Sequence, residues 1–156
     1  MPSEEQPQRR IWKGIVLHHT AGRDTTRLEA DNIWRLHVHG NGWLNTGYHR
    51  IVERLEDGRY YSVNGRPLFM HGAHSPPVNQ THLGVALVGN FEAERAPDDA
   101  IEAVAIECAS LCAVTGVPSS EIYPHNRFRS TACPGLLAGQ IPEIKRQVQA
   151  LLDEWI

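Results

Sequence analysis

The sequence predicts a single α/β domain in which a central mixed, mostly parallel β-sheet is flanked by about three α-helices. The main reason is that short apolar runs, typical of buried strands, alternate along the chain with segments of helical period. The length of 156 residues suffices for one domain with a substantial core. Hydrophobic residues at 41% and charged residues at 21% are ordinary for a globular protein, so disorder, collagen and coiled coil are excluded.

The chain begins with a polar segment and a first strand. Residues 1–10 are polar and are expected to form an N-terminal arm, so the domain is expected over residues 11–156. Residues 13–20 form an apolar, β-branched run that predicts a strand buried on both faces. Because strand side chains alternate, His18 and His19 at its carboxyl end should face opposite sides of the sheet. Ligands of open α/β proteins collect at this edge.

A helix and a hairpin are expected next. Thr26 and Glu29 have capping-box spacing and predict a helix that runs toward Gly40. An Asp-Gly turn separates two strand-like runs, residues 48–55 and residues 59–63, and predicts a β-hairpin.

Alternation in the first hairpin strand predicts that Tyr48, Arg50 and Val52 share one face of the sheet. Residues 64–81 are rich in Gly, Pro, His and Asn and lack a sustained period, which is typical of a binding loop. The remaining predicted elements are a strand within residues 82–91, a helix between Pro97 and Gly116, a short strand over residues 121–123 and a last helix from Pro142.

Two potential metal ligands lie near the end of the chain. His125 and Cys133 are eight positions apart in a segment bounded by prolines, and His18 is the best third ligand. Three such ligands would leave the fourth position of a tetrahedral zinc ion open for water. The alternative is ordinary packing, with His18 a hydrogen-bonded core histidine and Cys133 a small buried residue. Two further pairs could offer imidazoles to a metal: His37 with His39, and His71 with His74.

Charge and cysteine content narrow the classes of function. A formal charge of −3 gives no support for binding to nucleic acid or to acidic membranes, and no apolar run is long enough to span a bilayer. Three cysteines do not make a disulfide framework, so Cys108 and Cys112, one helical turn apart, are expected in the core. The N-terminal residues lack the apolar segment of a secretory signal, which predicts synthesis in the cytoplasm.

Five motifs occur in order along the chain, at residues 18–22, 42–49, 72–74, 83–91 and 125–135. Together they closely resemble the zinc N-acetylmuramoyl-L-alanine amidases, the family that includes small phage lysins and animal peptidoglycan recognition proteins. The resemblance runs from about Ile15 to Pro134. It implies a fold like that of the peptidoglycan recognition proteins.

The resemblance also implies roles for individual residues. It implies that His18, His125 and Cys133 bind one catalytic zinc ion and that Tyr48 is a catalytic residue beside it. Thr131 stands where family members place a lysine or a threonine that assists catalysis, although it could instead cap a turn.

Some bacterial relatives carry a glutamate on the central strand, where this chain has Ala86 or Val88. The resemblance therefore leaves this chain without the expected carboxylate base on that strand. Residues that could line the substrate groove can also be suggested, although packing or loop hydrogen bonds fit His74 and Asn90 equally well. The suggested residues are Trp43, His74, Asn90 and Arg66.

The function expected from this resemblance is hydrolysis of the amide bond between N-acetylmuramic acid and L-alanine of the peptidoglycan stem peptide. The expected protein is a monomeric, bacteriolytic phage endolysin that acts on the host cell wall after the membrane is breached. Two alternatives stay open: a recognition module that binds peptidoglycan without cutting it, and a bacterial enzyme of cell-wall recycling.

Overall fold

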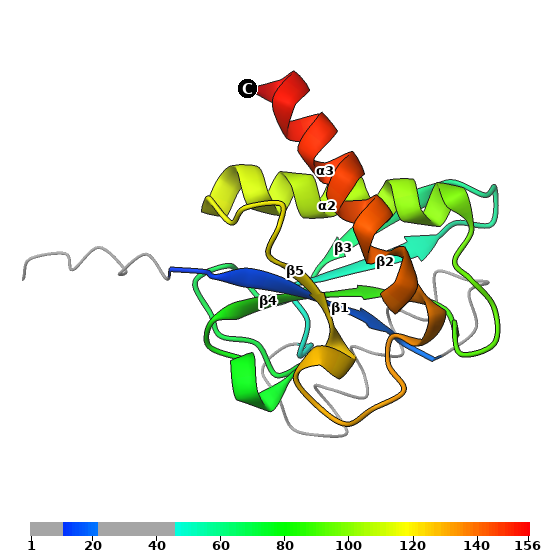
Figure 1. The fold of residues 1–156 in the computed structure, drawn as a ribbon, viewed down its shortest axis with the longest axis horizontal. Helices are drawn as coiled ribbons and strands as arrows, with labels where there is room; N and C mark the ends of the chain where they lie inside the picture. Colours follow the sequence, from blue (N-terminus) through cyan, green and yellow to red (C-terminus); the bar gives the residue numbers. More distant parts are fainter. Residues whose placement is uncertain (1–10, 22–45) are drawn as a thin grey trace, which may run out of the picture.

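The computed structural model describes residues 11–21 and 46–156, which form a five-stranded sheet with helices packed against it (Figure 1). The predicted N-terminal arm, the helix predicted from Thr26, the pair His37 and His39, and Trp43 lie outside the described residues. The strands are β1 (Gly14–His19), β2 (Arg50–Arg54), β3 (Tyr60–Asn64), β4 (His82–Leu87) and β5 (Ile122–Pro124).

The sheet is mixed and mostly parallel, as the sequence predicted. Its strand order is β3-β2-β4-β1-β5; β2 and β3 are antiparallel, because a turn joins them in a hairpin, and the other pairings are parallel. The register places His18 of β1 beside Ala86 of β4, and Ala86 beside Ile51 of β2. The carboxyl end of β1 therefore lies between the ends of β4 and β5.

Two α-helices of the described residues, α2 (Asp98–Thr115) and α3 (Ile141–Trp155), pack on the same side of the sheet (Figure 1). α2 ends where Gly116 adopts the left-handed conformation, with φ at 79°, and donates its N–H to the carbonyl of Cys112. Apolar side chains of both helices and of the sheet form the main core, in which Cys108 and Cys112 are buried as predicted. Among the described helices, none combines the length and apolar character that a membrane span requires.

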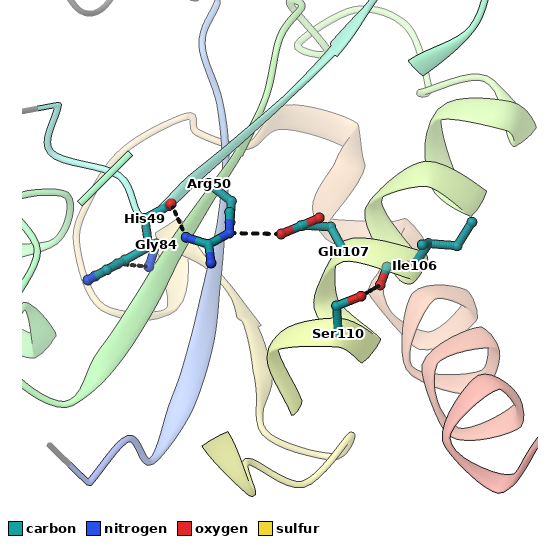
Figure 2. A network of polar contacts seen from close by, with 6 residues as sticks. All are labelled: His49, Arg50, Gly84, Ile106, Glu107 and Ser110. Atoms are coloured by element: carbon teal, nitrogen blue, oxygen red, sulfur yellow. Dashed lines mark hydrogen bonds and ion pairs between the residues drawn. The ribbon is translucent and has the colours of Figure 1, made fainter. Parts of the chain in front are cut away.

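An ion pair joins β2 to α2 (Figure 2). Nε of Arg50 lies 3.1 Å from Oε1 of Glu107, and the two side chains are only 18% and 16% exposed. The same guanidinium donates through Nη1 to the carbonyl of His49 at 2.7 Å. Arg50 therefore faces α2, as does Val52 of the main core. The ring of His49 turns elsewhere and accepts the N–H of Gly84.

The opposite face of the sheet carries the side chains that alternate with this core. Ile15 and Leu17 of β1 belong to the core, so His18 lies on the other face. We call this surface the His18 face. Among the described residues it includes Val16, His18, Ile51, Glu53, Gly84, Ala86 and Val88.

Three 3-10 helices of the described residues lie in the loops around the sheet. η2 (Pro76–Val78) interrupts the long segment that the sequence predicted to be a binding loop. η3 (His125–Arg127) follows β5 directly, and η4 (Gly135–Gln140) leads into α3. Cys133 lies in the segment between η3 and η4. β5 precedes η3 and α3 follows η4, so regular elements hold both sides of this segment.

Candidate metal centre

Three side chains converge at the carboxyl ends of β1 and β5. The strands pair so that Leu17 lies beside Pro124, and the next residues along them, His18 and His125, therefore meet. The ring centroids of these two histidines are 4.3 Å apart. Sγ of Cys133 lies 3.9 Å from Nδ1 of His18. One potential ligand atom from each of the three side chains lies within 4.8 Å of the others.

The ring nitrogens of His125 provide a separate test of the metal hypothesis. Nδ1 and Nε2 are both buried, and neither has a hydrogen-bond partner within residues 11–21 and 46–156. A buried polar atom left unpaired costs about 1–3 kcal/mol, so a buried atom without a protein partner calls for a water molecule or an ion as its partner. His18 and Cys133 add a second nitrogen and a sulfur, and two imidazoles with one thiolate are ligands that zinc prefers. The residues present therefore fit a zinc ion.

Burial determines the charge state of these side chains. It lowers the pKa of His18 well below the usual value, with nearby His74 acting in the same direction, and it lowers the pKa of His125. Burial raises the pKa of Cys133 to about 11, although a hydrogen bond from the backbone of His19 acts in the opposite direction. A divalent cation reverses this preference at the sulfur, because it stabilises the thiolate over the thiol.

Contacts from behind hold two of the three side chains in place. Nε2 of His18 lies 2.9 Å from Nδ1 of His74. The backbone N–H of His19 donates to Sγ of Cys133 at 3.4 Å. The ring of His19 turns to the core side, as predicted, and its Nδ1 accepts the N–H of Phe91 at 3.1 Å. His18 therefore contributes its ring to the centre, whereas His19 contributes its backbone N–H.

Tyr48 lies beside the three side chains, with its ring centroid 5.1 Å from that of His18. Burial, followed by the influence of Cys133, raises the pKa of Tyr48 to about 12, so its hydroxyl keeps its proton at neutral pH. The predicted face of Tyr48 is wrong, because Tyr48 packs with Ile51 on the His18 face while Arg50 faces α2. β2 begins only at Arg50, so strand alternation does not extend back to Tyr48.

Thr131 shapes the segment that carries Cys133. Its Oγ1 accepts the backbone N–H of Cys133 at 3.2 Å, which is the turn-capping contact that the sequence left open. The hydroxyl also has a hydrogen that it can donate to a further acceptor.

Similarity to known proteins identifies the family of this chain. A family profile described as N-acetylmuramoyl-L-alanine amidase matches residues 7–136. The chain belongs to this amidase family. The N-acetylmuramoyl-L-alanine amidase of Sus scrofa is 34% identical over an alignment 130 residues long, which covers 78% of this chain and 21% of the pig protein. The chain thus spans about a fifth of the length of this curated relative.

Solved structures confirm the amidase fold that the resemblance implied. The endolysin N-acetylmuramoyl-L-alanine amidase LysCS from Clostridium intestinale URNW has a TM-score of 0.72 and 30% identity, with 88% of this chain and 84% of that chain covered. A complex of tracheal cytotoxin with the ectodomains of peptidoglycan recognition proteins LCa and LCx has a TM-score of 0.69 and 25% identity. That match covers 82% of this chain and 78% of that chain.

Two residues suggested to line the substrate groove of this amidase-family chain differ in their surroundings. Arg66 is buried, and its guanidinium donates to the carbonyls of Thr46 at 2.7 Å and His71 at 3.0 Å. Asn90 is exposed, and its Oδ1 accepts the N–H of Glu92 at 3.0 Å. Arg66 therefore braces its loop from within, whereas Asn90 lies at the surface.

The His18 face differs from that of some bacterial relatives, because β4 lacks the glutamate that they carry on the central strand. Ala86 and Val88 are both buried on that face, so β4 offers no carboxylate there. Glu53 of β2 is a fully buried carboxylate on the same face, and its Oε2 accepts the O–H of Tyr61 at 2.6 Å. Residue type alone does not predict the burial of Glu53, because charged side chains are usually exposed.

Proposed function

We propose that this chain is a zinc-dependent N-acetylmuramoyl-L-alanine amidase that hydrolyses the amide bond between N-acetylmuramic acid and L-alanine of the peptidoglycan stem peptide. The observation that carries the proposal is the convergence of His18, His125 and Cys133 in a chain of the amidase family. The proposed catalytic domain spans residues 11–156, binds the muramyl peptide of peptidoglycan and acts as a monomer.

His18, His125 and Cys133 would hold the zinc ion as three protein ligands, which leaves one tetrahedral position for water. Zinc bound in this way lowers the pKa of its water toward about 7 and polarises a carbonyl group. The contacts that His74 and His19 make from behind keep two of the ligands oriented before any metal binds.

Tyr48 is proposed to donate its hydroxyl hydrogen to the oxygen of the scissile carbonyl as negative charge develops there. Its raised pKa of about 12 keeps this donor protonated throughout the neutral range. Thr131 already accepts the N–H of Cys133, and its own hydroxyl hydrogen is proposed to orient the attacking water. Because Ala86 and Val88 occupy the strand positions, β4 supplies no carboxylate that could act as a general base here.

We further propose that the enzyme is a phage endolysin, a setting supported by the endolysin LysCS among its structural neighbours. The rival function is a recognition module, since other neighbours are peptidoglycan recognition proteins. The presence of Cys133 favours the enzyme, because a module that only binds has no need for a three-ligand zinc site with an open position. A recycling amidase would share the chemistry but would prefer soluble muropeptides to intact wall.

Mass spectrometry of purified peptidoglycan after digestion tests the proposal. We expect released stem peptides with a new free L-alanine amino group and glycan strands of unchanged length. Chelation should abolish the release, and added zinc should restore it. Shortened glycans, or cut cross-links without free lactyl groups on muramic acid, would contradict the bond assignment. Retention on peptidoglycan without any released peptide would identify a recognition module.

A further inference from the structure

A chain of imidazole contacts runs from the metal centre into the protein. Nε2 of His18 lies 2.9 Å from Nδ1 of His74, and Nε2 of His74 lies 2.9 Å from the backbone carbonyl of His82. The two rings are edge to face, with an interplanar angle of 86°. Both nitrogens of His74 are therefore engaged within the protein.

The direction of both hydrogen bonds follows from the backbone carbonyl of His82. A backbone carbonyl can only accept, so Nε2 of His74 carries the hydrogen that is donated to His82. A neutral imidazole that donates from Nε2 has a lone pair on Nδ1 and accepts there, so Nε2 of His18 is the donor in the second contact. His18 then carries its hydrogen on Nε2 and its lone pair on Nδ1. This Nδ1 is the atom that lies 3.9 Å from Sγ of Cys133.

The ring of His74 packs closely against two glycines, Gly72 and Gly84. A Cβ atom added at Gly72 would lie 2.4 Å from Cδ2 of His74, and one added at Gly84 would lie 2.6 Å from Cγ. Oδ1 of Asn79 accepts the backbone N–H of His74 at 2.9 Å and that of Ser75 at 2.7 Å. Two glycines and an asparagine thus seat the ring before any ligand arrives.

We propose that His74 is a positioning residue: it holds His18 in the Nε2–H tautomer, so that the Nδ1 lone pair faces the metal. The inference rests on the proposed zinc site and deepens it. An imidazole that donates to a fixed acceptor is a better oriented metal ligand, and loss of such a partner typically weakens metal affinity about 10- to 100-fold. The proposal thus gives His74 a role in supporting the metal centre in place of the suggested role in the substrate groove. The low exposure of His74, 8%, agrees with this role.

The tautomer can be measured directly in the metal-free protein. Long-range proton–nitrogen NMR correlations of the imidazole rings distinguish Nε2–H from Nδ1–H. We expect His18 in the Nε2–H form, with a slowly exchanging hydrogen. His18 in the Nδ1–H form, or a mixture in fast exchange, would overturn the proposal. This readout needs neither zinc nor activity, so it stands even if the proposed amidase function fails.

A matched pair of variants tests the consequence for the metal. In His74→Asn, Oδ1 takes the place of Nδ1 and can accept from His18, whereas His74→Leu has a similar size and no acceptor. Both variants lose the ring contact with His82, so this loss cancels in the comparison. We expect His74→Leu to bind zinc about 10- to 100-fold more weakly than wild type in competition with a chelator, and His74→Asn to recover most of that loss.

Two further results separate the possible outcomes. The d–d spectrum of the cobalt-substituted protein should change in His74→Leu and stay close to wild type in His74→Asn. Equal zinc affinities in the two variants would overturn the positioning role, while normal zinc binding with reduced affinity for muropeptide would return His74 to the substrate groove. Wild-type protein that binds no zinc would contradict the proposed function and leave the tautomer assignment to the NMR result.

Discussion

Gly84 is the position at which one added methyl group tests the packing behind the metal centre. In Gly84→Ala the new Cβ would lie 2.6 Å from Cγ and 2.7 Å from Cδ2 of His74, closer than real Cβ atoms approach. The ring can relieve this overlap only by moving away from β4. That movement stretches the contact of 2.9 Å between His74 and His18.

The expected size of the effect follows from this overlap. Overpacking a buried site usually costs about 1–3 kcal/mol. In a chain of this length each 1 kcal/mol lowers the melting temperature by roughly 2–4 °C, so we expect a loss of roughly 2–12 °C. Gly139→Ala is the matched control, because an added Cβ there meets no atom within 4 Å. Its melting temperature should stay near that of wild type.

Circular dichroism of the zinc-free proteins measures the melting temperatures, and competition with a chelator measures zinc affinity. We expect Gly84→Ala to lose both stability and zinc affinity, whereas Gly139→Ala should lose neither. If Gly84→Ala behaves like Gly139→Ala in both assays, the argument that packing against β4 positions His74 is refuted.

Three other predictions concern the site and its support. Burial raises the pKa of the Cys133 thiol to about 11, so zinc binding should release about one proton from this thiol. The logarithm of the apparent zinc affinity should therefore rise by about one unit per pH unit between about pH 7 and pH 9. An affinity that does not change with pH would contradict this prediction. Tyr48→Phe should lower kcat about 100- to 1,000-fold with unchanged zinc content, whereas lost zinc would make Tyr48 part of the metal site instead. Arg50→Met should lower the free energy of unfolding, measured with urea, by about 1–3 kcal/mol, because Glu107 stays mostly buried without its partner. Arg146→Met is the control: its ion pair is exposed, so the free energy of unfolding should stay nearly unchanged. Equal losses of unfolding free energy in the two variants would contradict the effect of burial.

Much of the fold and the three candidate ligands could be predicted from local sequence. The strand around Ile15 and the helix that ends at Gly116 follow from apolar periodicity and end signals, which depend on near neighbours in the chain. His125 and Cys133 stood out because prolines bound their segment, and His18 because it ends a strand. These features do not depend on how the strands are ordered in the sheet.

The errors and omissions share a physical cause. Tyr48 was placed on the wrong face because strand alternation was extended past the start of β2. The hydrogen bonds that hold the Arg66 guanidinium were not predicted, because a buried guanidinium needs acceptors and only folding brings the carbonyls of Thr46 and His71 to it; contact of Arg66 with substrate stays a prediction. In both cases the outcome depends on contacts that residue type and spacing do not contain.

The sequence by itself therefore determined the class of fold, the amidase family and the candidate zinc ligands, because composition, periodicity and motifs are properties of the chain. Only the tertiary structure decided how those residues work together. The pairing of β1 with β5 brings His125 to His18, and the pairing of β1 with β4 puts Gly84 on the same face as His18, where the ring of His74 meets both. The hydrogen bond between His18 and His74 joins residues 56 positions apart, and only folding brings such distant groups together.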